Sequence, residues 1–328
     1  MLLTWSCNEQ RQEESESILL FKGREYPYAF CWQGTYYFMM QPQGDQFTLY
    51  ATNDLRQLPS AKPKTIWSPD SLNLHHFWAP EIYRINNKWY IYFEADDGNT
   101  DNHQLYVIEN DSDDPMTGEW TMKGILHTND DWNFGLHPNV LEVRGELYLL
   151  WSGWPKRRVE HETQCIYIAH MSNPWTVDSE RVMLSQPEYE WERQWINPDG
   201  TRSAYPIYVN ENPEAYLSPD GSQVCLFYSA SGVWTRYHTL GMLTAPATAN
   251  LLDPGVWTKS PEPIIIEEGA YGTSNISVVS NRDSTFLLYE ALRADHPGEV
   301  EQRSIFLKTV RWDEDGKLRF NDNSDEPQ

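Results

Sequence analysis

The sequence predicts an all-β protein, a five-bladed β-propeller, and two observations lead to this prediction. A turn followed by an aromatic-rich strand recurs five times along the 328 residues. No convincing amphipathic helix of about 12 residues or more interrupts the pattern. Repeats of about 50–75 residues that each contain several short strands are typical of propellers, in which each repeat forms one blade.

The aromatic strand is the clearest part of each repeat. It follows a turn signal such as Gln33-Gly34 or Pro219-Asp220-Gly221. The strand is nearly all apolar, which predicts burial on both faces of its sheet. The five copies are residues 36–40, 89–93, 147–151, 224–228 and 286–289.

An earlier and a later strand accompany each aromatic strand. In three repeats the earlier strand begins with Pro27, Pro80 or Pro138, each 13 residues before the end of its aromatic strand. Pro213 stands 15 residues before that point in the fourth repeat, and Ser274-Asn275 takes its place in the fifth. The later strands are expected at residues 47–51, 105–108, 166–169, 240–243 and 305–308.

A single domain is expected over residues 21–320, with an N-terminal extension at 1–20 and a tail at 321–328. Two β-sandwiches side by side are the alternative. The constant 13-residue offset favours the propeller, and no linker rich in Gly, Ser or Pro separates two halves.

The charge excludes several partners. Asp and Glu number 48 against 25 Lys and Arg, a net charge of −23, which repels nucleic-acid phosphates and anionic membrane surfaces. No apolar run reaches the roughly 18 residues of a membrane span. The 15 Trp and 19 Tyr suit strands and surfaces that stack on sugars. A small-molecule or oligosaccharide partner, neutral rather than anionic, is therefore expected.

The cysteines and the N-terminus predict a cytoplasmic protein. Cys31, Cys165 and Cys225 lie in or beside apolar runs and are interpreted as reduced core residues. The apolar stretch from Met1 to Cys7 is short and lacks the basic region of a signal peptide.

Metal-binding signals are weak, and no cofactor is expected to be required. The adjacent His75 and His76 point to opposite faces of a strand and do not easily share a metal. Residues 96–101 match part of a calcium loop but lack its final Glu, so they are interpreted as a turn. A structural calcium in the central channel is the one ion considered.

The mouth of the channel is the predicted site, because the first strand of every blade converges there. The residues aligned at this point are Tyr26, Ala79, His137, Glu211-Asn212 and Ser274-Asn275. A Tyr, a His and a Glu that meet in a funnel form a plausible chemical site. Glu214 competes with Glu211 for the carboxylate role.

Aromatic side chains near these strands are the predicted substrate-binding walls. The candidates are Trp78, Trp151, Trp154 and Trp234, joined by Asn275 and Arg303. The alternative interpretation of each Trp is a core residue, and a lone His on an inner strand is often a hydrogen-bonded structural group.

Several motifs, in order from about residue 20 to residue 320, resemble family 43 glycoside hydrolases. They are residues 77–83 (FWAPEIY), 87–93 (NKWYIYF), 150–154 (LWSGW), 167–176 (YIAHMSNPWT), 228–231 (YSAS) and 256–263 (VWTKSPEP). The resemblance implies a five-bladed propeller that hydrolyses arabinofuranosides, xylosides or related plant linkages with inversion.

The resemblance also implies site roles. The family uses an Asp as general base on blade one, an Asp that tunes the acid on blade three, and a Glu as general acid on blade four. The acid position is Glu211, but Tyr26 stands at the base position and His137 at the tuning position. Asn275 takes the place of a His near the channel centre. Glu25 is expected to point to the opposite face of its strand from Tyr26.

Three functions follow. The first is a glycoside hydrolase with altered machinery, in which His137 acts as base or tunes Glu211, or in which Tyr26 is a nucleophile. The second is a sugar-binding propeller that has lost hydrolysis. The third is a protein-interaction propeller that uses its rim. Residues 194–208 are interpreted as an extra loop that reshapes the pocket.

Overall fold

The computed structural model describes residues 17–69, 72–128, 132–157, 162–195, 207–267, 269–281, 284–293, 302–313 and 316–320. Within these ranges the helices are short 3-10 turns, η1 (Leu55–Ser60), η2 (Thr100–Asn102), η3 (Glu190–Glu192) and η4 (Pro254–Val256). None of the helices in the described ranges is long and apolar enough to span a bilayer. The chain is all-β, as predicted.

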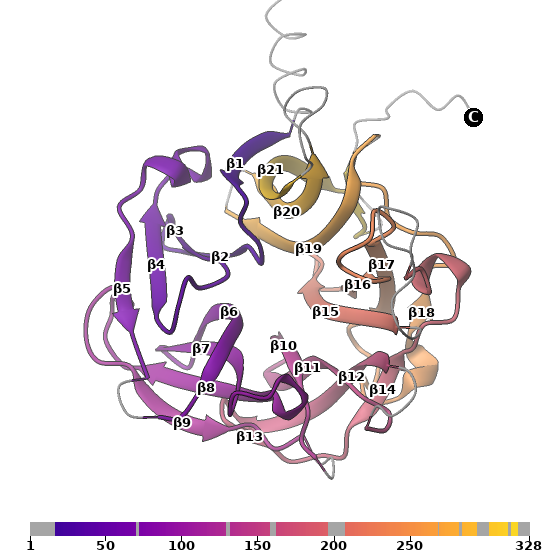
Figure 1. Ribbon diagram of the computed structural model, residues 1–328, viewed down its shortest axis with the longest axis horizontal. Coiled ribbons are helices and arrows are strands. Elements are labelled where there is room, and N and C mark those ends of the chain that lie inside the picture. The colour runs from indigo at the N-terminus through magenta and orange to yellow at the C-terminus, as the bar shows by residue number, and fades with distance from the viewer. Residues whose placement is uncertain are drawn as a thin grey trace, which may run out of the picture.

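The strands form sheets that surround a central axis, the arrangement of a β-propeller (Figure 1). The first sheet contains β2 (Tyr28–Trp32), β3 (Thr35–Met39), β4 (Phe47–Thr52) and β5 (Lys64–Trp67). The second contains β6 (His75–Ile85), β7 (Lys88–Asp96), β8 (Gln104–Asn110) and β9 (Thr121–Ile125).

A parallel contact joins two groups of strands into the largest sheet. One group is β10 (Leu136–Val143), β11 (Glu146–Gly153) and β12 (Glu162–Asn173), with β13 (Thr176–Val177) and β14 (Val182–Ser185) paired to β12. The other is β15 (Ile207–Leu217), β16 (Gln223–Ala230), β17 (Thr239–Pro246) and β18 (Thr258–Lys259). Strands β12 and β15 pair in parallel, whereas the neighbouring pairs are antiparallel.

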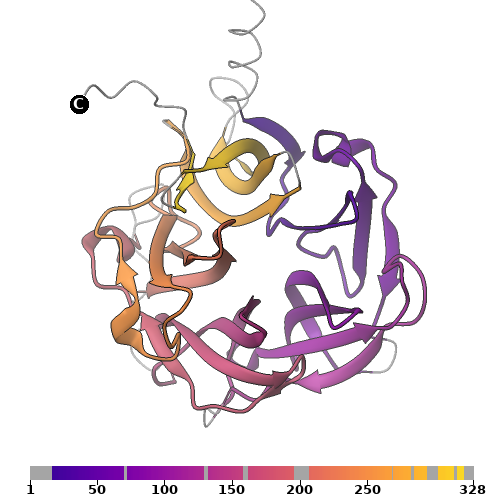
Figure 2. The same ribbon diagram turned by 180° about the vertical axis from the view of Figure 1, so that it is seen from behind.

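The first described strand completes the last sheet. This sheet contains β19 (Tyr271–Ser280), β20 (Thr285–Arg293), β21 (Gln302–Trp312), β22 (Leu318–Arg319) and β1 (Ile18–Lys22). Strand β1 pairs antiparallel with β21, and Ile18 lies opposite Leu307. The first and last described strands, β1 and β22, thus belong to one sheet, seen from behind in Figure 2. The predicted boundary between residues 20 and 21 falls inside β1, while 1–16 and 321–328 lie outside the described residues.

The repeat predicted from the sequence is confirmed strand by strand. The aromatic strands are β3, β7, β11, β16 and β20, and the later strands are β4, β8, β12, β17 and β21. The inner strands β2, β6, β10, β15 and β19 follow one another around the axis, and each packs on the next. We number the repeats 1 to 5 by these inner strands.

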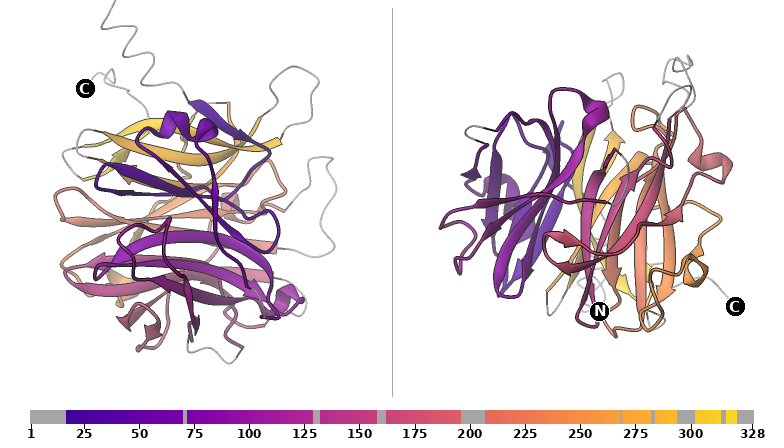
Figure 3. Two further views of the ribbon diagram at one scale, coloured as in Figure 1. Left: turned by 90° about the vertical axis from the view of Figure 1, so that its left-hand side faces the viewer. Right: turned by 90° about the horizontal axis from the view of Figure 1, so that it is seen from below.

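The core lies between the sheets, which are twisted and stacked face to face around the axis (Figure 3). Trp89 of β7 is fully buried, and its ring meets that of Tyr37 of β3 edge-on, with ring centroids 5.2 Å apart. Cys165 and Cys225 are buried free thiols and Cys31 is half-buried, as predicted. Because fully burying one large apolar side chain contributes about 1.5–3 kcal/mol, the aromatic strands stabilise each sheet against its neighbours.

Candidate functional site

A ring of five residues with left-handed backbone marks the inner strands. These residues occupy the same place in repeats 1 to 5: Tyr26 (φ 55°), Ala79 (φ 42°), His137 (φ 53°), Asn212 (φ 51°) and Asn275 (φ 44°). This conformation is strained for residues other than glycine, at about 1–3 kcal/mol each, so surrounding contacts must hold it. In the fourth repeat the ring residue is Asn212, and Glu211 precedes it.

Each ring residue is held by a side chain from the preceding repeat. The backbone N–H groups of the ring residues donate as follows: Tyr26 to Glu290, Ala79 to Gln41 Oε1 (3.3 Å), His137 to Glu94, Asn212 to Ser152 Oγ (2.9 Å) and Asn275 to Ser229 Oγ (3.1 Å). These hydrogen bonds link neighbouring repeats at the level of the channel mouth. Two of the five acceptors are carboxylates, and they lie behind Tyr26 and His137.

A pocket of about 380 Å³ lies at this ring, within the usual size range of small-molecule sites. Its lining residues are Glu25, Tyr26, Gln41, Trp78, Leu136, His137, Gln164, Val209, Glu211, Val233 and Trp234. The predicted catalytic residues Tyr26, His137 and Glu211 are therefore brought together. The rings of Tyr26 and His137 stack with centroids 5.3 Å apart and planes inclined by 18°.

Glu25 also lines the pocket, so the prediction that it faces away from Tyr26 is wrong. Alternation of side chains holds only for regular extended backbone. The left-handed Tyr26 breaks it, and residues 25 and 26 both reach the pocket. The sequence does contain a signal for Glu25 as a pocket residue, because this Glu directly precedes a Tyr-Pro pair at the start of a blade.

The predicted aromatic walls divide into two groups. Trp78 and Trp234 line the pocket. Trp151 and Trp154 are 0% and 1% exposed, and their rings stack on Tyr167 and Phe134, respectively, the latter at a centroid distance of 3.7 Å. The structure therefore places Trp151 and Trp154 in the core, outside the pocket lining.

Asn275 and Arg303 lie behind the pocket, where both bind Glu290. Asn275 Nδ2 donates to Glu290 Oε1 at 3.0 Å, and Arg303 Nη1 lies 3.4 Å from Glu290 Oε2. The Arg303 guanidinium also donates to the carbonyls of Gly272 (2.8 Å) and Val233 (2.7 Å). Both residues are buried and hold Glu290 in place beneath Tyr26.

Burial sets the protonation of the titratable groups in the five-residue ring and directly behind it. The pKa of Tyr26 is raised well above its usual value, first by burial and then by the charges of Glu211 and the other nearby carboxylates, so Tyr26 is a neutral phenol. Burial lowers the pKa of His137 to about 3, so its imidazole is neutral at pH 7 and a weak base. Burial also raises the pKa of Glu94 strongly and that of Glu290 to about 7.

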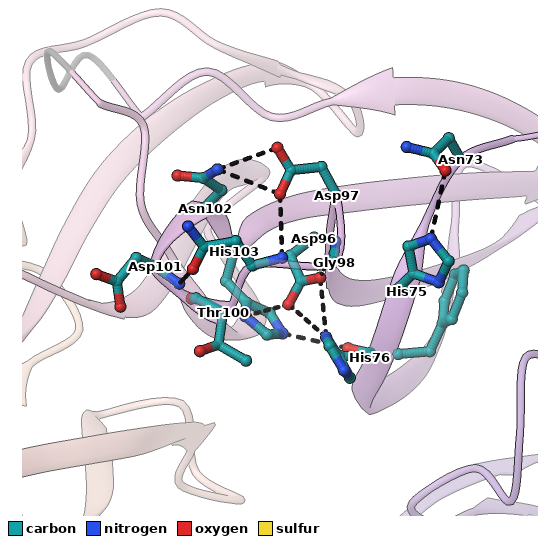
Figure 4. Close-up of polar contacts among 12 residues, drawn as sticks. Asn73, His75, His76, Asp96, Asp97, Gly98, Thr100, Asp101, Asn102 and His103 are labelled. Carbon is teal, nitrogen blue, oxygen red and sulfur yellow. Dashed lines mark hydrogen bonds and ion pairs between the residues drawn. The ribbon is translucent and has the colours of Figure 1, made fainter.

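A histidine–aspartate cluster in repeat 2, drawn in Figure 4, lies against Trp78. The Trp78 ring stacks on His103 at a centroid distance of 4.3 Å. The buried Asp96 lies between two imidazoles, with Nδ1 of His76 at 2.9 Å and Nδ1 of His103 at 3.0 Å. His75 has a different partner, Asn73 (3.3 Å). This cluster orients the indole that walls the pocket.

The loop at residues 96–101 is a turn, as predicted. Asp96 Oδ1 accepts from the N–H of Gly98 at 2.7 Å, and Asp97 Oδ1 accepts from the N–H of Asn99 at 3.2 Å. The helix η2 follows directly. These carboxylates satisfy the backbone of their own loop, which is the usual role of Asp in turns.

Deeper in the channel, two carboxylates are bound by neutral donors. Glu214 Oε2 accepts from Asn139 Nδ2 at 3.0 Å and from the Tyr216 hydroxyl at 2.9 Å. Glu81 accepts from Asn139 and the Tyr83 hydroxyl. Burial raises the pKa of both carboxyl groups, and Glu214 does not line the pocket that holds Glu211.

This donor-rich cluster does not suit a structural calcium, which takes six to eight oxygen ligands. The described ranges contain no group of three or more His, Cys, Asp or Glu side chains placed to hold a metal. The Oε2 atoms of Glu81 and Glu214 instead accept hydrogen bonds from hydroxyl and amide donors.

A channel-mouth pocket with carboxylates and indole walls is a layout suited to carbohydrates. The chain matches glycosyl hydrolases family 43 over residues 22–318, and it belongs to that family. It is 33% identical over 302 residues to an extracellular exo-α-(1→5)-L-arabinofuranosidase of Streptomyces avermitilis, an alignment that covers 88% of this chain and 59% of that protein. It is also 33% identical over 273 residues to an enzyme of the same name from Streptomyces chartreusis, with 79% and 76% covered.

The crystal structure of an α-L-arabinofuranosidase from Lactobacillus brevis is similar with a TM-score of 0.77 and 31% identity, covering 92% of this chain and 95% of that one. The chain spans 59% of the length of three curated relatives that it matches. The expectation of a cytoplasmic protein is wrong, because the two Streptomyces relatives are named extracellular enzymes.

Proposed function

We propose that the protein is a secreted α-L-arabinofuranosidase that releases arabinofuranose from plant-type oligosaccharides. The observation that carries the proposal is the pocket lined by Glu211, Tyr26, His137 and the indoles of Trp78 and Trp234. The names of the relatives support the choice of sugar. In this proposal the largest sheet contains two blades joined by β12 and β15, so the propeller has five.

Glu211 is the general acid in this proposal. It is half-buried and lines the pocket, and it is the one of the three family carboxylates retained at its expected position. A carboxylic acid at this point protonates the leaving glycosidic oxygen. Tyr26 and His137 are neutral, since burial raises the pKa of the phenol and lowers that of the imidazole to about 3. They hydrogen-bond the sugar and shape the pocket rather than take a proton from water.

A sugar-binding propeller without hydrolysis is the second candidate. It is favoured by one observation: Tyr26 and His137 stand where the family resemblance implies two Asp residues. This candidate predicts saturable binding of arabino-oligosaccharides, and it predicts no released sugar even after long incubation.

The test compares wild type with Glu211→Gln on α-(1→5)-linked arabinobiose, on aryl arabinofuranosides and on xylosides, with released sugar measured by chromatography. We expect arabinose from wild type and a loss of about 10²–10⁴-fold in kcat/KM on arabinobiose for Glu211→Gln. Glu262→Gln is the matched control, because Glu262 is exposed and lies outside the pocket. Wild-type activity in Glu211→Gln would contradict the acid assignment, and binding without product would favour the second candidate.

A further inference from the structure

We propose that Glu25 is the general base of this site, displaced by one residue from the position at which the family resemblance implies an Asp. This inference rests on the proposed function. It assigns the missing half of an acid–base pair to a side chain that family membership does not indicate.

The local geometry of Glu25 repeats that of Glu211. Both residues directly precede a left-handed residue that is followed by proline, in the segments Glu25-Tyr26-Pro27 and Glu211-Asn212-Pro213. The left-handed residues have φ angles of 55° and 51°, so the backbone turns in the same way at both places. Both glutamates line the same pocket as a consequence.

The two glutamates reach the pocket from repeats that are not neighbours. Glu25 precedes β2, whereas Glu211 lies in β15. Around the axis, β19 separates these strands on one side, and β6 and β10 separate them on the other (Figure 1). An inverting glycosidase needs its acid and base on opposite sides of the sugar, far enough apart to admit a water molecule.

The other two carboxylates near Tyr26 are not accessible to substrate. Glu94 and Glu290 are 0% exposed. Each accepts the backbone N–H of a ring residue, His137 and Tyr26, respectively. The side chain of Glu25 is 45% exposed, so it reaches solvent water, which a general base must deprotonate. Among the residues that the structure describes, Glu25 and Glu211 are the accessible carboxylates that line this pocket.

A buried cation orients the Glu25 carboxylate. Arg303 Nε lies 4.0 Å from Glu25 Oε1, and the Arg303 side chain is 7% exposed. The guanidinium is itself fixed by the carbonyls of Gly272 and Val233 and by Glu290. Arg303 is therefore a positioning residue, which holds the carboxylate at the rim of the pocket.

The reaction balances with these two groups. The Glu25 carboxylate accepts one proton from a water molecule, whose oxygen bonds to the anomeric carbon from the face opposite the leaving group. The bond between the anomeric carbon and the glycosidic oxygen breaks, and that oxygen takes the proton of the Glu211 carboxylic acid. Solvent then returns a proton to Glu211 and removes one from Glu25. The sugar is released with inverted configuration.

The test separates the base from the acid by the leaving group. Wild type, Glu25→Gln, Glu211→Gln and the control Glu262→Gln are assayed on α-(1→5)-linked arabinobiose and on 2,4-dinitrophenyl α-L-arabinofuranoside. A base is needed for both substrates, whereas an acid is dispensable when the leaving group is a stable anion. We expect Glu25→Gln to lose about 10²–10⁴-fold in kcat/KM on both substrates. Glu211→Gln should recover most of its activity on the dinitrophenyl substrate.

A second variant keeps the assignment testable if Glu25→Gln is poorly folded. Glu25→Ala should be rescued by azide, which attacks without a base and gives an arabinosyl azide of inverted configuration; rescue requires a folded pocket. Wild-type rates in Glu25→Gln, or a loss confined to arabinobiose, would overturn the assignment and leave the proposed function standing. No product from wild type on any substrate would overturn the proposed function and the base assignment together.

Discussion

Repeats 1 and 3 differ from repeats 4 and 5 in how the ring residue is held. In repeats 4 and 5 the backbone N–H of the ring residue donates to a serine hydroxyl, Ser152 or Ser229. In repeats 1 and 3 it donates to a buried carboxyl group, Glu290 or Glu94. Both kinds of acceptor bind the backbone N–H of a left-handed residue, and a neutral hydroxyl does so without the cost of burying a charge.

The difference teaches that the same backbone conformation can be held by a carboxyl group or by a hydroxyl group. Repeats 1 and 3 are the repeats in which the family resemblance predicts an Asp at the positions of Tyr26 and His137. A carboxyl group lies directly behind each of these two residues. Burial raises the pKa of Glu94 strongly and that of Glu290 to about 7. These two carboxyl groups therefore bind a proton at a higher pH than an exposed Glu does, whereas a serine hydroxyl does not titrate in this range.

The largest expected effect comes from removing one buried carboxyl group. Glu290→Ala deprives the buried Arg303 of its partner and leaves the N–H of Tyr26 and the amide of Asn275 without their acceptor. At pH 8, where the Glu290 carboxyl group is mostly ionised, breaking this buried ion pair costs about 3–5 kcal/mol. Urea unfolding should show this loss, and a loss below that of Ser229→Ala would contradict the comparison.

A smaller effect separates the repeats by pH. Burial raises the pKa of Glu290 from the usual 4.5 to about 7, so the folded state binds the proton more tightly than the unfolded state. The resulting stability is complete below pH 4.5 and is lost as the pH rises through 7. Relative to Glu290→Gln, which does not titrate, wild type should lose about 2 kcal/mol of unfolding free energy between pH 5.5 and 8.

That measurement consists of urea unfolding of both proteins at the two pH values. Ser229→Ala is the control, because a hydroxyl carries no proton equilibrium in this range and its difference from wild type should not change with pH. A constant difference between wild type and Glu290→Gln would show that Glu290 does not titrate as its burial implies.

The smallest effect is expected in repeats 4 and 5. Ser229→Ala removes the acceptor of the Asn275 N–H, whose bond is 3.1 Å long and buried. Leaving a buried donor unsatisfied costs about 1–3 kcal/mol. Thermal or urea unfolding measures it, and Ser284→Ala, at a residue whose N–H donates to Asn281 in an exposed hydrogen bond, is a surface control. A change no larger than that of the control would show that this hydrogen bond does not hold the ring.

Much of the fold was predictable because its signals are local. An apolar strand such as residues 89–93 (WYIYF) after Asn86-Asn87 specifies a turn and a doubly buried strand without reference to the rest of the chain. The 13-residue offset between the proline and the end of the aromatic strand aligned Tyr26 with His137, because each of them directly precedes that proline. Trp151 and Trp154 were harder, because a Trp at a strand end is compatible with both a core and a pocket wall.

The buried acids carried a weaker signal. Glu94 and Glu290 interrupt apolar runs in Phe93-Glu94-Ala95 and Tyr289-Glu290-Ala291. A charged residue in a buried strand requires a partner, so both were detectable as unusual. Their partners are backbone groups of the next repeat around the axis, and pairing across repeats is not encoded by any spacing within one repeat.

The sequence by itself determined the strands, the order of the repeats and the family, because periodicity and motifs are properties of neighbouring residues. Only the tertiary structure decided which side chains face the pocket. The left-handed backbone at Tyr26 and Asn212 is maintained by hydrogen bonds from other repeats. That conformation, not the alternation of a regular strand, turns Glu25 and Glu211 toward the same site.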